Sequence, residues 1–344
     1  MTTLATPSGR TATAGRMGPV PTGTTTAVAI MIATVVVVAT CSMLIGSVTI
    51  SPAAVLDPGH VDHGIALARW PRTCLGLAIG AALALAGACM QGLTRNPLAD
   101  PGILGINAGA SFAMVLAISW LGINGLQGRL WFAFAGAAVA ALAVHAIASL
   151  GRDGATPMKL TIAGAALTAA LGSWISAILL TDRKTLDVFR FWQVGTLGGR
   201  DFDVLLTGLP FLVVGAVLAF TGAGLLNLLA LGDDLARSLG RRVVLDRIVI
   251  GLAIVLLAGT ATALAGPVAF VGLVIPHLVR SVVGSDYRRI LPFSVGYGAV
   301  LTLAADVVGR VILPPTEVQV GIMTAVLGVP VFLWMIGRRR MGGL

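Results

Sequence analysis

The sequence predicts an all-α polytopic membrane protein with about ten transmembrane helices. Of its 344 residues, 57% are hydrophobic and only 11% are charged, a balance that no water-soluble fold of this size would expose or bury comfortably. Apolar stretches long enough for a helix to cross roughly 30 Å of hydrocarbon recur from residue 27 to residue 337. The stretches lack the polar–apolar alternation of barrel strands, and lipid satisfies no backbone group, so helices are the expected solution.

The expected spans are separated by short polar segments rich in Gly, Pro, Arg and Asp. We place them at residues 26–50, 64–94, 104–121, 129–150, 158–181, 203–224, 244–266, 269–283, 288–312 and 318–337. The third and the eighth are short for a full crossing. Residues 1–25 are rich in Thr, Gly and Pro and are predicted to form a disordered cytoplasmic tail ahead of a single transmembrane domain, residues 26–340. No small-residue cleavage site precedes a soluble domain, so we expect the first span to be retained.

The charge pattern indicates membrane topology rather than nucleic-acid binding. The formal net charge is +9, yet the basic residues are spread around the spans and form no basic soluble domain. With an even number of spans and both termini in the cytoplasm, most Lys and Arg residues face the cytoplasm. The expected exterior set is Arg69, Arg72, Arg129, Arg183, Lys184, Arg190, Arg200 and Arg310. So many exterior cations hint at an acidic partner on that side.

Two segments repeat a pattern. RTCLGLAIGAALALAG from Arg72 and RIVIGLAIVLLAGTATALAG from Arg247 share Arg, then GLAI, then ALAG. Under the expected topology they run in opposite directions, which is the inverted-repeat design of many transporters. Each copy ends in a Gly/Pro-broken segment followed by a short span, typical of discontinuous helices beside a pathway. Chance similarity between two Ala/Leu/Gly-rich helices is the alternative.

Several kinds of chemistry are absent from the sequence. No GxxxxGK[ST] motif occurs, and the only lysines are Lys159 and Lys184, so the chain carries no P-loop of its own. The spans lack the acidic or histidine relays of proton-driven carriers, apart from Asp306 near a span end. A partner ATPase would supply the energy, while a passive channel stays open as an alternative. No nucleophile, base and orienting group assemble, so we expect neither an enzyme nor a cofactor.

Metal and thiol chemistry are also not expected. His60 and His63 could ligate a metal, but a solvated loop is the favoured interpretation. Cys41, Cys74 and Cys89 lie in apolar runs without CxxC spacing and are expected to be packing residues.

Six motifs in order resemble one family. They are ARWPRTCLGLAIGAALALAGACMQGLTRNPLADPGILGINAGA (68–110), RFWQVGTLGGRD (190–201), LALGDDLARSLG (229–240), ALAGPVAFVGLVIPHLVR (263–280), ADVVGR (305–310) and TAVLGVPVFLWMI (324–336). Together they are similar to the FecCD-type permeases of binding-protein-dependent ABC importers for iron-siderophores, haem and cobalamin. The resemblance implies a ten-helix subunit in a cytoplasmic membrane that pairs with a second permease subunit, two ABC ATPase subunits and an extracytoplasmic substrate-binding protein.

The resemblance also implies roles for residues at both ends of the spans. Exterior arginines of the family bind acidic residues of the binding protein, which indicates Arg69, Arg72 and Arg310 here, since Arg grips carboxylates bidentately. Snorkelling at the interface is the alternative for the first two. The loop 225–243 resembles the short coupling helices that fit a groove on the ATPase, with a break at Gly232. The expected ATPase contacts are Leu235, Ala236, Leu239 and Gly240.

Gate residues are expected by the same route. The segment from Gln91 to Pro101 resembles the cytoplasmic gate, where Asn96 would close the path, and Thr156 is carried over as its companion. A periplasmic gate is expected near Thr181 and Asp182, before a short helix at 184–192, although Asp182 departs from the small neutral residue of the pattern.

The function that the resemblance implies is import of a ferric-siderophore complex by alternating access, driven by ATP hydrolysis in a separate subunit. Haem or cobalamin import is the alternative within the family. A passive channel or ion-coupled carrier is the alternative from another class.

Overall fold

The computed structural model describes residues 23–123, 125–151, 155–240 and 242–341, and every regular element in these ranges is a helix. The elements are α1 Gly23–Leu44, α2 Pro52–Leu56, α3 His63–Thr94, the 3-10 helix η1 Pro101–Leu104, α4 Ile106–Ser119, α5 Leu126–Ala148, α6 Pro157–Thr181, α7 Arg183–Gln193, α8 Phe202–Thr221, α9 Ala223–Ala230, α10 Asp233–Ser238, α11 Val243–Ala265, α12 Val271–Val283, α13 Tyr287–Val311 and α14 Val320–Met341. Most of the expected tail, residues 1–22, lies outside the described residues.

All ten expected spans coincide with helices. Within the described residues, seven helices are long and apolar enough to cross a membrane, namely α1, α3, α5, α6, α8, α11 and α13. Three shorter apolar helices, α4, α12 and Val320–Trp334 of α14, correspond to the third, eighth and tenth expected spans. The all-α membrane fold is confirmed.

The first expected span is too long at its end. It was placed at 26–50, but α1 ends at Leu44. The carbonyl groups of Met43 and Val48, in the last turn and the following loop, accept hydrogen bonds from the guanidinium of Arg69. A side chain from another helix thus satisfies backbone groups that a longer helix would have paired internally.

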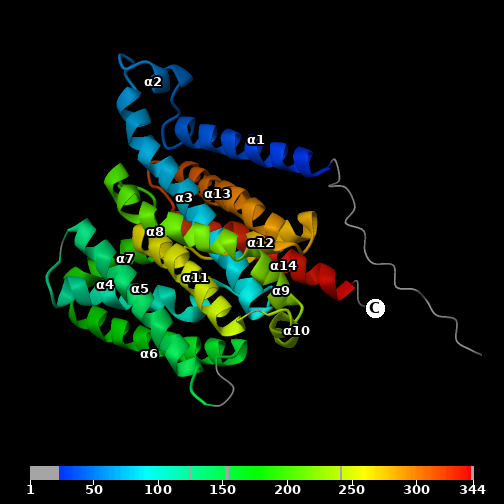
Figure 1. Cartoon of the computed structure of the whole chain (residues 1–344). Helices are drawn as coiled ribbons and strands as arrows, with labels where there is room; N and C mark the ends of the chain where they lie inside the picture. The colour runs from blue at the N-terminus through cyan, green and yellow to red at the C-terminus, as the bar shows by residue number, and fades with distance from the viewer. Residues whose placement is uncertain (1–22, 124, 152–154, 241, 342–344) are drawn as a thin grey trace, which may run out of the picture.

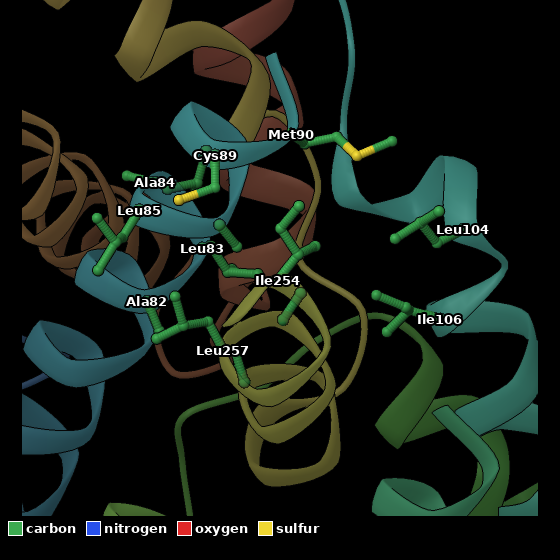
Figure 2. Packing of buried hydrophobic residues seen from close by; sticks show 14 of the residues in the cluster. Ala82, Leu83, Ala84, Leu85, Cys89, Met90, Leu104, Ile106, Ile254 and Leu257 are labelled. Carbon is green, nitrogen blue, oxygen red and sulfur yellow. The ribbon is translucent and has the colours of Figure 1, made fainter. Parts of the chain in front are cut away.

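Helix α3 lies at the centre of the bundle (Figure 1). It contacts α1, α8, α9, α11, α12 and α13, and most of its residues are buried. Helices α4, α5 and α6 form a group on one side of it, and α1 packs against α3 and α13 on the other (Figure 1). Figure 2 shows side chains of α3 such as Leu83 facing Ile254 and Leu257 of α11.

Glycines set how closely the helices approach α3. A methyl group at Gly80 would overlap the Gly298 carbonyl oxygen of α13, and one at Gly87 would overlap the Gly272 carbonyl oxygen of α12. Gly76 is less extreme, because its added methyl group would meet the flexible Leu303 side chain at 2.6 Å. The small-residue face of α3 therefore makes backbone-to-backbone contacts with two neighbouring helices.

The predicted repeat has the expected form. Asp233 contacts both Arg95, just after the end of α3, and Arg247, near the start of α11, so the two helices run in opposite directions. Each is followed by an irregular segment and a short helix, α4 after α3 and α12 after α11. Left-handed backbone marks the breaks, with φ of 52° at Arg95 and 68° at Phe270.

Replacing Gly87 by Ala tests the central packing. The added methyl group meets backbone atoms of α12 that cannot rotate away. We therefore expect the free energy of unfolding to fall by about 1–3 kcal/mol and the midpoint of thermal unfolding in detergent to be lower. Gly64 lies in the same helix with no atom within 4 Å of an added methyl group, and Gly64→Ala should keep or raise the midpoint. Equal midpoints for Gly87→Ala and the parent would contradict the packing argument.

Candidate functional site

The bundle has two ends that differ in their side chains. At one end, called here the α10 end, lie the last turn of α3, the first turn of α11, α9 and α10. At the other, called the α7 end, lie α7, the segment after it and the last turn of α11, where the Thr196 N–H donates to the Ala265 carbonyl at 2.7 Å.

Asp233, the first residue of α10, bridges two helices. One carboxylate oxygen accepts from the Arg247 guanidinium of α11 at 2.8 Å, and the other pairs with Arg95, which follows α3. Arg95 also donates through Nε to the Leu229 carbonyl of α9 at 2.6 Å. All three charged side chains are partly buried, with 25–39% of their area exposed, so the charges are less screened than on an open surface. Helix α10 is therefore connected to both repeats through Asp233.

A second clamp fixes α9. The Asn227 side chain donates to Asp286 at 2.6 Å and accepts from the Tyr287 N–H at 2.9 Å. The pKa of Asp286 lies below its ordinary value: burial alone would raise it, but hydrogen bonds from Asn227 and the Arg288 N–H, with the charges of Arg288 and Arg289, outweigh burial. The carboxylate is thus held charged at the start of α13, joining that helix to α9.

The expected contact loop 225–243 folds as two short helices, α9 and α10, with a break at Gly232, where φ is 117°. Leu235 and Leu239 expose 46% and 58% of their surface, although leucines are usually buried. Gly240 is also exposed, with φ of 78°. Ala236 differs from the expectation, because it is fully buried against the rest of the chain and offers no surface to a partner.

The segment between α3 and α4 is the expected gate region. Asn96 is exposed, and its side chain accepts from the Leu98 N–H at 3.0 Å, which closes a turn directly after left-handed Arg95. Asp100 caps η1 by accepting from the Gly102 N–H at 2.8 Å. These short-range bonds pair the Leu98 and Gly102 N–H groups where the backbone leaves the helix.

Gln91 explains why a polar side chain stands in an apolar run. It is 2% exposed, and its amide donates to the Leu273 carbonyl at 3.1 Å and the Gly272 carbonyl at 3.4 Å. Pro276, four residues after Gly272, has no N–H to offer that carbonyl. Gln91 therefore supplies the donor that the proline removes from α12 and joins the break in one repeat to that in the other.

Of the other three expected gate residues, two cap helices. Thr156 directly precedes α6, and its hydroxyl accepts from the Lys159 N–H at 3.3 Å. Asp182 directly precedes α7, which spans Arg183–Gln193 against the expected 184–192. Its carboxylate accepts from the N–H and hydroxyl of Thr185 at 3.1 and 2.5 Å. These two bonds lower the pKa of Asp182. An acidic residue replaces a small neutral one here because it caps a helix. Thr181 ends α6 with its hydroxyl bonded to the Ile178 carbonyl at 2.9 Å.

The three expected docking arginines lie together, but largely inside the chain. Arg69 is 7% exposed and donates to the Met43 and Val48 carbonyls. Arg310 is 2% exposed and donates to the carbonyl and hydroxyl of Ser42, each at 3.0 Å.

Two carboxylates complete this cluster. Arg72 grips both oxygens of Asp306, at 2.8 and 3.0 Å, and reaches Glu317 at 2.7 Å. Asp306 also pairs with Arg310 at 3.1 Å. The cluster of three arginines and two acids keeps one excess positive charge. Only its Arg72–Glu317 edge is substantially open, with 16% and 35% of the side chains exposed. Sequence reasoning missed these pairings, although a lone acid in a span needs a cation.

The described part of the chain contains no cluster of side chains suited to binding a metal ion. No group of three or more His, Cys, Asp and Glu residues there could hold an ion. His60 accepts from the Asp62 N–H at 3.1 Å, and His63 lies 2.9 Å from the Ala54 carbonyl, so both are used within their own loop. The three cysteines are free thiols.

Comparison with known proteins decides the family. The sequence profile of the FecCD transport family matches residues 32–338. The chain belongs to the FecCD transport family. Its helices, breaks and short loop helices are thus those of a membrane transport subunit, and its relatives are transport permeases rather than enzymes.

Three relatives and one structure show how far the likeness to this FecCD-family chain extends. It is 46% identical to the probable siderophore transport system permease protein YfiZ of Bacillus subtilis (strain 168), over 78% of this chain and 81% of that protein. It is 45% identical to the ferric enterobactin transport system permease protein FepD of Escherichia coli (strain K12), over 88% and 92%. It is 36% identical to the hemin transport system permease protein HmuU of Yersinia pestis, over 79% and 82%. A solved inward-facing conformation of a metal-chelate type ABC transporter superposes with a TM-score of 0.80 and 27% identity, over 91% of this chain and 99% of that one.

Replacing Asp233 by Asn tests the bridge. The variant lacks the negative charge that pairs with both arginines. We therefore expect the backbone N–H groups of residues 94–100 to exchange with deuterium several-fold faster, which corresponds to a loss of about 1 kcal/mol in local stability. Asp187→Asn removes an exposed pair with Arg190 and should leave that segment unchanged. The bridge has no such role if both variants exchange alike.

Proposed function

We propose that the chain is the permease subunit of an ABC importer that carries a ferric-siderophore complex across the cytoplasmic membrane. In this proposal it works by alternating access, driven by ATP hydrolysis in separate subunits. The observation that carries it is the Asp233 bridge, in a chain whose relatives named for siderophore transport reach 45–46% identity. The bridge joins a loop helix with exposed leucines to both repeats.

The chelate class is supported by a gradient of similarity. The relatives named for siderophore and ferric enterobactin transport are 46% and 45% identical, whereas those named for hemin and cobalamin are 36% and 37% identical. Haem or cobalamin is the alternative substrate within the family. The remaining alternative is a passive channel or ion-coupled carrier.

Coupling would proceed through α10. Leu235 and Leu239 would enter an apolar groove on an ABC ATPase, since burying two exposed leucines favours association. Asp233 would carry the displacement to Arg95 and thence to Asn96, which lies next to it in the gate segment. Thr156 at the start of α6 and Thr181 and Asp182 at its end would mark the cytoplasmic and periplasmic limits of one moving helix.

The complex would hold two ATPases below and a substrate-binding protein above. In this arrangement the α10 end and both termini are cytoplasmic. The path for a large chelate would lie between this chain and a second permease subunit, with both embedded in membrane lipid.

Docking of the binding protein would use the arginine cluster at the α7 end. Its excess positive charge attracts acidic residues, and Arg72 with Glu317 presents its open edge. Because Arg69 and Arg310 are buried, they would add to the electrostatic attraction without contacting the binding protein directly.

We expect the association rate of the binding protein to fall at least several-fold between low and physiological salt. A rate that is independent of salt would contradict this docking surface.

Reconstitution tests the function. The chain is placed in vesicles with its ATPase and second permease subunit, binding protein is added outside, and uptake of labelled ferric enterobactin, haem and cobalamin is compared. We expect uptake of the ferric siderophore only with ATP. The double variant Leu235→Asp and Leu239→Asp should stop uptake, because two charged side chains cannot enter an apolar groove.

A matched control separates coupling from folding. Leu121, which follows the end of α4 at Ser119, is as exposed as Leu239, at 59%, and the Leu121→Asp variant should transport normally. Uptake without any ATPase would favour the passive or ion-coupled class. Uptake of haem or cobalamin alone would replace the substrate and keep the importer.

A further inference from the structure

A cavity of about 260 Å³ lies among α3, α5, α6 and α11, near the α10 end. Leu93, at the end of α3, and Leu104, in η1, form its inner wall, next to the gate segment. Ala138, Ala141, Gly251 and Val255 line its sides. Of the residues in the Asp233 bridge, Arg247 also lines this cavity.

The lining of the cavity is too apolar to bind ordered water favourably. By volume the cavity would take roughly nine water molecules at about 30 Å³ each. Buried water needs two to four polar partners per molecule, and among the described side chains that line this cavity only His145 and Arg247 offer nitrogen atoms. A hydrocarbon chain satisfies such a wall better than water.

The mouth of the cavity opens on an apolar face of the bundle. Three of its lining residues are strongly exposed, Leu142 at 69%, Leu252 at 50% and Ile248 at 49%. Around them, Val139 and Val244 are exposed at 65% and 71%. In a chain that spans a membrane, such a face lies against lipid.

Charge selects the headgroup. Among the described residues of the lining, the polar ones are His145 and Arg247, both of the basic type, and none of these lining residues is a carboxylate. The Arg247 bond to Asp233 uses one terminal nitrogen, whereas a guanidinium carries five N–H donors in a fork that suits phosphate. His145 is exposed in the last turn of α5 and can donate to the same phosphate.

We propose that this cavity binds one anionic phospholipid, with an acyl chain between α5 and α11 and the phosphate at Arg247 and His145. The lipid belongs to the leaflet at the α10 end. Its phosphate shares Arg247 with Asp233, so the occupied site contacts the bridge to α10. Binding itself does not depend on what the chain transports.

Native mass spectrometry of the detergent-purified chain tests the site. Phosphatidylglycerol and phosphatidylcholine with identical acyl chains are added in equal amounts. We expect one phosphatidylglycerol to be retained about tenfold more than phosphatidylcholine, because both lipids carry the phosphate but Arg247 repels the choline cation of phosphatidylcholine. Arg247→Gln should abolish this preference.

A filled cavity provides the second variant. Gly251 lines the cavity and has no atom within 4 Å of an added methyl group, so we expect the side chain of Gly251→Leu to fill part of the cavity and to leave the Arg247–Asp233 pair in place. We expect it to lose the retained lipid. Gly172 in α6 is equally unobstructed but does not line the cavity, and Gly172→Leu should bind lipid as the parent does.

Two results would overturn the site. One is equal retention of the two lipids by the parent chain. The other is undiminished phosphatidylglycerol binding by Gly251→Leu.

Discussion

The close approach of α3 to α12 and α13 is the constraint on which the rest of the structure depends. At Gly80 and Gly87 no side chain separates the backbones, because any Cβ would overlap a carbonyl oxygen of the neighbouring helix. Packing of this kind replaces the hydrophobic effect, which does not hold helices together in lipid. It also brings Gln91 within reach of the α12 carbonyls. The broken helices can exist because the polar groups they release are buried against protein.

The two ends of this core use charge differently. At the α7 end, Asp306 lies between Arg72 and Arg310, and removing one partner of so buried a pair costs about 3–5 kcal/mol. That cluster locks the ends of α3 and α13 together. At the α10 end, Asp233 and its arginines are a quarter or more exposed, and the helix it begins is only six residues long. The buried cluster at the α7 end therefore suits a rigid part of the bundle, and the partly exposed Asp233 bridge at the α10 end suits a part that moves.

Features with a local signal could be predicted from the sequence. The ten spans follow from hydropathy, and the break at Gly232 follows from glycine ahead of two acidic residues. The short helix after Asp182 was expected from the family resemblance, and its capping by Asp182 was not foreseen. Pairings over long separations could not. Arg72 and Asp306 are 234 residues apart, and nothing along the chain tells which of several exterior arginines meets the acid. The burial of Ala236 was missed because a helix of six residues is too short to show an apolar period.

The central claim is that α10 and the gate segment move as one unit, joined through Asp233. The most direct measurement is the distance between spin labels at Leu98 and Ser238, both exposed, in the full complex with and without ATP. The account predicts an unchanged distance within the subunit, while the distance between Leu98 and its counterpart in the second permease subunit changes. A changed distance within the subunit, with a constant distance across the path, would contradict it.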